Sequence, residues 1–88
     1  MSVHKAISAH SKKQHELVKS FVGLDTMREQ AIEAAVALCK EGKNFSVDNI
    51  NAVTQQINEL AKNNGIVPTR KYVTEEMVKE YVNRLTNQ

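Results

Sequence analysis

Apolar residues recur every three or four positions along most of the chain, which is the spacing that gathers them on one side of an α-helix. Four such segments are separated by residues typical of helix ends. They predict helices near residues 3–21, 25–41, 46–64 and 74–86, with no sheet. The predicted fold is therefore all-α, a small bundle of about four helices.

The first predicted helix carries a long stripe that is polar in its middle. Its positions alternate in steps of four and three, and they are Val3, Ile7, His10, Gln14, Leu17 and Phe21. Gly23 is expected to end this helix, because Gly takes the left-handed conformation of a C-terminal cap without strain. Thr26 and Glu29 have the spacing of a capping box, with Asp25 as a competing cap, and predict that a second helix begins there.

The second predicted helix is apolar over a wide arc, which favours a central position with neighbours on two sides. Gly42 is expected to end it. Ser46 is a suitable N-cap for the third helix, and Gly65 follows its end. Thr74, followed by two glutamates, predicts the start of the fourth helix, since acidic residues are favoured in a first turn.

Composition adds limits to this picture. A chain of 88 residues has room for one domain, residues 1–88, and its 41% apolar and 25% charged residues are ordinary for a globular protein. The formal net charge of +2 is too small to imply a polyanionic partner. Cys39 is the single cysteine, which excludes an internal disulfide. No segment resembles a secretory signal or a membrane span of ~20 apolar residues, so a cytoplasmic location is expected.

Three stretches carry a resemblance to a known family. They are Ser2-Val3-His4-Lys5-Ala6-Ile7, His10-Ser11-Lys12-Lys13-Gln14-His15 and Val67-Pro68-Thr69-Arg70-Lys71-Tyr72-Val73-Thr74. In these the chain resembles a small family of uncharacterised helical proteins from Bacillus and its relatives. The resemblance implies a bacterial cytosolic protein of one short domain, and it implies no activity, ligand or catalytic residue.

The histidines do not form a metal-binding pattern. Two ligands on one helix need a spacing of three or four residues, and no pair among His4, His10 and His15 has it. Cys39 lies on a predicted apolar face, where a lone cysteine usually behaves as a small core residue. No phosphate-binding glycine loop and no buried carboxylate pair is indicated. We therefore expect no metal, no cofactor and no enzymatic activity.

The polar positions of the first stripe suggest a candidate interaction surface, made of Val3, Ile7, His10 and Gln14. Polar residues at buried heptad positions can fix the register or the oligomeric state of paired helices. His10 also titrates near neutral pH, so its protonation could modulate packing. The alternative interpretation is that both polar residues lie at the edge of the bundle.

A candidate basic patch combines Lys12 and Lys13 with Arg70 and Lys71, beside the aromatic ring of Tyr72. Such a patch could contact phosphates, with the ring as a stacking surface. The connection before the last helix is, however, too long for a helix–turn–helix, and that helix is acidic at its start. The favoured function is a non-enzymatic interaction or regulatory protein that binds a protein partner or a second copy of itself. The alternative is a nucleic-acid-binding module.

Overall fold

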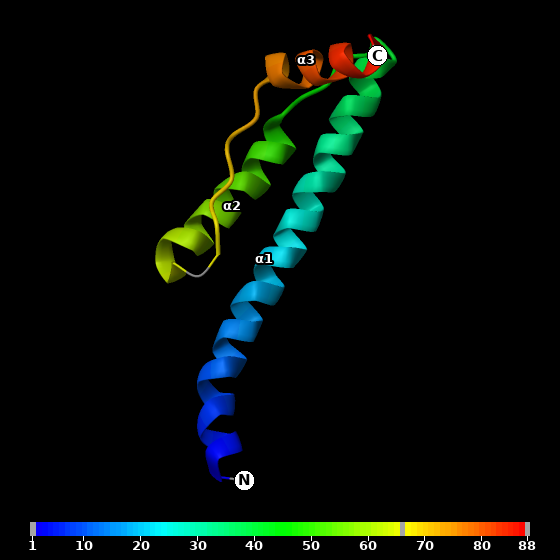
Figure 1. Ribbon diagram of the computed structural model, residues 1–88. Coiled ribbons are helices and arrows are strands. Elements are labelled where there is room, and N and C mark those ends of the chain that lie inside the picture. Colours follow the sequence, from blue (N-terminus) through cyan, green and yellow to red (C-terminus); the bar gives the residue numbers. More distant parts are fainter. Residues whose placement is uncertain (1, 66, 88) are drawn as a thin grey trace.

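A computed structural model describes residues 2–65 and 67–87 of the chain, with side chains from residue 14 onward. Within these residues the chain forms three α-helices and no strand. Helix α1 spans Ser2–Lys40, α2 spans Asp48–Asn64 and α3 spans Glu75–Thr86 (Figure 1). The expected all-α class is confirmed, and the expected number of four helices is wrong.

The error lies at Gly23, where one helix of 39 residues continues through the expected break. The stripe of the first segment stays in phase across the glycine. It continues, again in steps of three and four, through Leu24, Arg28, Ala31, Ala35 and Leu38. A glycine inside a helix costs about 1 kcal/mol relative to alanine. That cost is smaller than the packing free energy that would be lost if the helix, and with it the apolar stripe, ended at Gly23.

The two residues expected to cap a second helix have other roles. Thr26 is exposed within α1 and caps nothing, because no helix begins there. Asp25 accepts a hydrogen bond from Arg70, which lies 45 residues further along the chain. The capping-box spacing of Thr26 and Glu29 was therefore a coincidence of composition.

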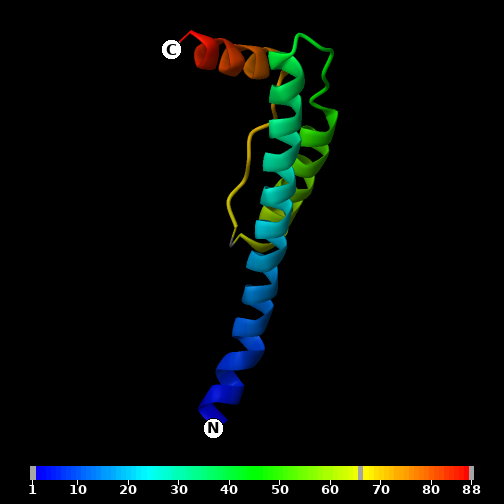
Figure 2. The same cartoon turned by 90° about the vertical axis from the view of Figure 1, so that its right-hand side faces the viewer.

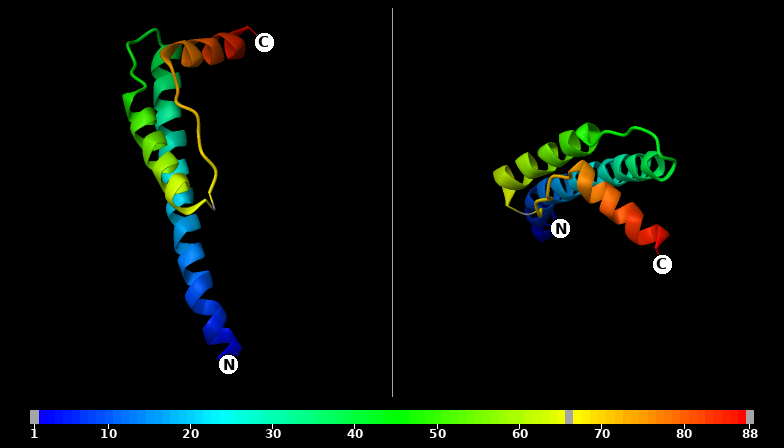
Figure 3. Two further views of the ribbon diagram at one scale, coloured as in Figure 1. Left: turned by 90° about the vertical axis from the view of Figure 1, so that its left-hand side faces the viewer. Right: turned by 90° about the horizontal axis from the view of Figure 1, so that it is seen from above.

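Helix α1 is the axis of an elongated molecule with extents of 60 × 23 × 17 Å. Helix α2 runs back along the C-terminal half of α1 (Figures 1 and 2). The connecting segment, residues 67–74, then returns beside these two helices without helical structure. Helix α3 lies across the C-terminal end of α1 rather than alongside it (Figure 3). The N-terminal part of α1 extends past all of these elements.

The core is small and lies where the C-terminal half of α1 meets the other elements. Its main cluster joins one alanine of α1 to residues of α2, the connecting segment and α3, namely Ala35, Ile50, Val73, Val78 and Val82. Ile50 and Ile57 of α2 are fully buried. The segment expected as a central second helix is thus the part of α1 that contacts both α2 and α3.

Several helix ends lie where the sequence predicts them. The hydroxyl of Thr74 accepts a hydrogen bond from the N–H of Met77, which makes Thr74 the N-cap of α3. Gly65 takes a left-handed φ of 66° directly after α2, and Gly42 takes a φ of 73° shortly after α1 ends. Helix α2 begins at Asp48, two residues later than the predicted boundary.

Candidate interaction surfaces

Two asparagines of α2 hold the connecting segment through its backbone. The side chain of Asn51 accepts a hydrogen bond from the N–H of Val73 at 2.8 Å and donates one to its carbonyl at 2.9 Å. Asn58 does the same for Arg70, at 2.8 and 3.0 Å. Each amide thus replaces the partner that a neighbouring strand would supply, and satisfies backbone groups that would otherwise be buried without partners.

Arg28 joins α1 to both of its neighbours. Its Nε donates to the hydroxyl of Thr54 in α2 at 2.9 Å, and one terminal nitrogen donates to the carbonyl of Lys71 at 2.8 Å. Thr54 is fully buried and donates its own proton to the carbonyl of Ile50. Arg28, a polar residue on the stripe of α1, therefore links α1 both to α2 and to the connecting segment.

Arg70, a member of the expected basic patch, is engaged inside the molecule. Its guanidinium bonds both carboxylate oxygens of Asp25, at 3.0 and 3.4 Å, and stands 5.2 Å from the centre of the Phe21 ring. The hydrogen bond to Asp25 raises the pKa of Arg70 above its ordinary value. Because its charge is paired, Arg70 is a poor phosphate ligand.

Among the other members of that patch, Lys71 is the one whose side chain the structure describes. Lys71 is exposed and adjacent to Arg70. Lys12 and Lys13 lie outside the residues whose side chains are described. Within the described side chains, the patch consists of one exposed lysine beside a paired arginine.

We define the projecting segment as residues 2–16 of α1, and the covered segment as residues 24–40. Side chains 14–16 are all exposed, and Leu17 is the first described side chain of α1 that is half-buried. Of the candidate interaction surface, Gln14 is exposed, whereas the side chains of Val3, Ile7 and His10 lie outside the described part. The backbone of all four belongs to α1 (Figure 2).

Between these two segments α1 exposes two valines. Val18 is 44% exposed and Val22 is 53% exposed, and they are separated by one helical turn. They lie beside the buried stripe rather than on it. Their exposure on a helix of a small protein marks a surface with no partner among the described residues.

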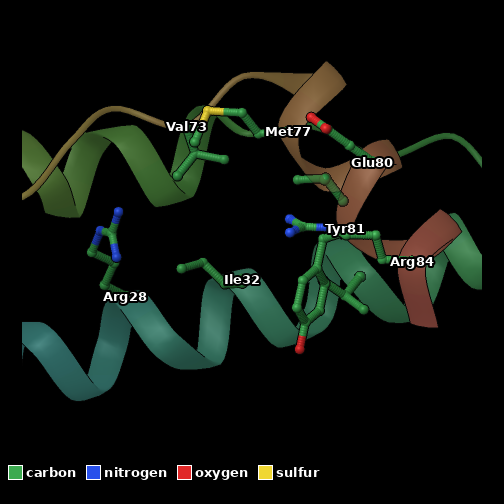
Figure 4. Close-up of a pocket in the computed structure, with 9 residues that line it drawn as sticks. Arg28, Ile32, Val73, Met77, Glu80, Tyr81 and Arg84 are labelled. Carbon is green, nitrogen blue, oxygen red and sulfur yellow. The ribbon is translucent and has the colours of Figure 1, made fainter. Parts of the chain in front are cut away.

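The crossing of α3 over α1 creates a groove, which we call the α1–α3 groove. Two adjoining hollows of about 410 and 370 Å³ share Ile32, Val36 and Tyr81. Met77 and Leu85 extend the wall on α3, and Met77, Tyr81 and Leu85 are 45%, 47% and 38% exposed. Figure 4 shows Ile32 rising from α1, Tyr81 reaching from α3 towards it, and Arg28 at one end.

Sequence reasoning did not find this groove, although its signal was present. Residues 77, 81 and 85 recur every four positions, beside a second row of Val78 and Val82 that is buried on α1. Two parallel apolar rows on one short helix are more than a single contact with α1 can cover.

Chemistry-bearing residues are dispersed in the described part of the chain. Cys39 is half-buried and packs against the core cluster, as a small apolar residue does. Among the described residues no three His, Cys, Asp or Glu side chains gather in a way that could hold a metal ion. His15 is exposed, and His4 and His10 lie outside the described side chains. No helix in the described part is long and apolar enough to span a membrane.

Fold and surfaces define an all-α protein built on one long helix, whose covered half forms the core. The chain belongs to the family described as "Protein of unknown function (DUF2533)", which matches residues 1–84. It is similar to the uncharacterized protein YpbS of Bacillus subtilis (strain 168), with 59% identity over 83 residues, covering 94% of this chain and 96% of that protein. No solved structure matches the chain. The resemblance to a Bacillus family is confirmed.

Proposed function

We propose that the protein acts without catalysis, as an interaction protein that associates with a second copy through the projecting segment of α1. The observation that carries this proposal is one heptad-like stripe, from Val3 to Leu38, that stays in phase along the 39-residue helix α1. Helices α2 and α3 lie beside the C-terminal part of α1 (Figures 1 and 2). Sustained steps of three and four are typical of helices that pair along their length.

A helical segment that no other element covers has few contacts to stabilise it. Isolated helices shorter than roughly 12–15 residues are marginal in water, because few backbone hydrogen bonds offset the cost of ordering the chain. The projecting segment has about that length. Its stripe begins with Val3 and Ile7, whose burial against another helix would contribute about 25 cal/mol per Å² of apolar surface. Pairing therefore supports a segment that the rest of the chain does not.

Gln14 is compatible with this proposal, because its side chain is exposed among the described residues and is accessible to a second copy. Polar residues at such positions in paired helices specify register at some cost in stability. We rank self-association above nucleic-acid binding because Arg70, the central member of the basic patch, is already paired with Asp25.

The test is the oligomeric state of the full chain across a concentration series, measured by sedimentation velocity. We expect a reversible dimer, which the double change Ile7→Lys with His10→Lys converts to a monomer that stays helical. The matched control is Ser2→Lys with Ala9→Lys, which adds the same charge away from the stripe and should leave the dimer intact. A wild-type protein that remains monomeric at every concentration would contradict the proposal.

A further inference from the structure

Asn64 and Gly65, at the end of α2, form a pair that occurs nowhere else in the chain. The chain has eight asparagines, and Asn64 is the one that is followed by glycine. The backbone nitrogen of the residue after an asparagine can attack the side-chain carbonyl carbon, which makes asparagine a chemically labile residue. A following glycine favours this attack, because it has no Cβ to obstruct it and allows more backbone conformations. The sequence therefore places its most reactive asparagine at the end of α2.

In the folded chain both reacting groups are held in other hydrogen bonds. The side-chain nitrogen of Asn64 donates to the carbonyl of Leu60 at 3.0 Å, and the N–H of Gly65 donates to the carbonyl of Ala61 at 2.8 Å. Asn64 is also the last residue of α2, and its helical backbone keeps the side-chain carbonyl away from the following nitrogen. The attack therefore requires that the last turn of α2 opens.

The last turn of α2 has little that keeps it closed. None of the helical residues after Ala61 is buried: Lys62 and Asn63 are exposed, and Asn64 is half-buried. This end of α2 is also the one remote from α3 and from Ile50, which belongs to the main core cluster (Figure 1). Helix ends with few buried contacts open locally at a small cost in free energy, while the rest of the protein stays folded. Opening of this turn therefore controls access to the reactive pair.

From these observations we infer that Asn64 is a site of spontaneous covalent modification, controlled by opening of the last turn of α2. When the turn opens, the nitrogen of Gly65 bonds to the side-chain carbonyl carbon of Asn64, and the bond from that carbon to the side-chain nitrogen breaks. The side-chain nitrogen leaves as ammonia with the proton that the Gly65 nitrogen loses, and a cyclic succinimide remains. Water then opens the ring at either carbonyl and gives aspartate or isoaspartate. Water is the co-reactant, nothing is oxidised or reduced, and the reaction does not depend on the proposed self-association.

Either product weakens the end of α2. A carboxylate at position 64 only accepts hydrogen bonds, so the hydrogen bond from this side chain to the carbonyl of Leu60 is lost. The new negative charge lies at the C-terminal end of a helix, where the helix dipole disfavours it. Isoaspartate also adds one carbon to the main chain directly before Gly65, whose N–H caps α2. Modification therefore favours the open state of the turn from which it arises.

The site is tested on the full chain by peptide mapping with mass spectrometry during incubation at neutral pH. We expect deamidation at Asn64 before any other asparagine, including the exposed Asn63 beside it. Gly65→Asn is the matched variant, because asparagine tolerates the left-handed conformation of the cap and its side chain obstructs the attack. It should slow the modification of residue 64 by about tenfold or more, with an unchanged circular dichroism spectrum. Equal rates in the two proteins, or earlier modification of another asparagine, would overturn the inference.

Control by the last turn is tested by Glu59→Gly, which creates a second asparagine–glycine pair within the same helix. Asn58 is then followed by glycine, but its side chain is held by two hydrogen bonds to Arg70, and it precedes the buried Ala61. In this variant Asn58 should react about tenfold or more slowly than Asn64 of the same molecule, since opening at Asn58 breaks more contacts. Equal rates at the two sites would show that the reaction follows unfolding of the whole chain, which would overturn control by the turn. An Asn64 that stays unmodified in the wild-type protein would overturn the whole inference.

Discussion

The covered and projecting segments of α1 belong to one helix and differ in what holds them. The covered segment contacts α2 and α3, contributes Ala35 to the core and is tied down by Arg28. In the projecting segment, the side chains that the structure describes, residues 14–16, are all exposed. Continuity of a helix is therefore no evidence of equal stability along it. We therefore expect substitutions of the same kind to change the free energy of unfolding strongly in the covered segment and weakly in the projecting segment.

The largest expected effect is a cavity beneath the covered segment. Ile50→Ala removes a fully buried side chain that packs against α1, and should lower the free energy of unfolding by about 2–5 kcal/mol. Val18→Ala, at an exposed position, should change it by less than about 0.5 kcal/mol in dilute protein. Urea unfolding followed by circular dichroism measures both. Similar losses would mean that the core beneath the covered segment and the surface of α1 at Val18 contribute equally to stability.

Next in size is the loss of an asparagine that holds the connecting segment. Asn51→Ala removes two hydrogen bonds to Val73 and leaves its backbone groups without partners, which should cost about 2 kcal/mol. Asn49→Ala on the exposed side of the same helix is the matched control and should be nearly neutral. Urea midpoints that do not separate the two variants would contradict the proposed role of Asn51.

A smaller effect is expected for the Arg70–Asp25 pair. Both side chains are partly exposed, at 33% and 25%, so solvent screens the pair and its coupling should be about 0.5–1 kcal/mol. A double-mutant cycle with Asp25→Asn and Arg70→Gln isolates this coupling. The coupling should decrease at high salt. A value of zero at low salt would place the pair among surface contacts that do not stabilise the fold.

The smallest expected effect lies at Gly23, directly before the covered segment. Gly23→Ala should stabilise the protein by about 0.5–1 kcal/mol, because the added Cβ meets no atom within 4 Å and alanine favours a helix. Gly65→Ala is the contrasting control and should destabilise by roughly 1–2 kcal/mol, since its φ is 66°. Destabilisation by Gly23→Ala in thermal unfolding would indicate a break in the helix at that residue.

The sequence predicted the parts of the fold that depend on local signals. Helical class follows from periodicity, and the caps at Thr74 and Gly65 follow from residue types with specific backbone preferences. The prediction that a helix ends at Gly23 was wrong. The apolar stripe keeps its phase across this glycine, so the helix continues. Local patterns should therefore be compared across a suspected break before the break is accepted.

Long-range contacts could not be predicted from such local signals. The pairing of Asn51 and Asn58 with Val73 and Arg70 joins residues that only the fold brings together. Likewise, the sequence placed Arg70 in a basic patch because the position of Asp25, 45 residues away, was unknown. Hydrogen bonds and ion pairs of this kind produce no periodic pattern in the sequence. The candidate interaction surface, in contrast, was predicted from the spacing within one helix, and it stays a prediction.

Amide hydrogen exchange at several protein concentrations tests the central claim most directly. The account predicts strong, concentration-independent protection in the covered segment. Protection in the projecting segment, residues 2–16, should be weak in dilute protein and should rise with concentration, because association supplies a partner. Protection of the projecting segment that is equal at all concentrations would contradict the claim that a second copy holds it.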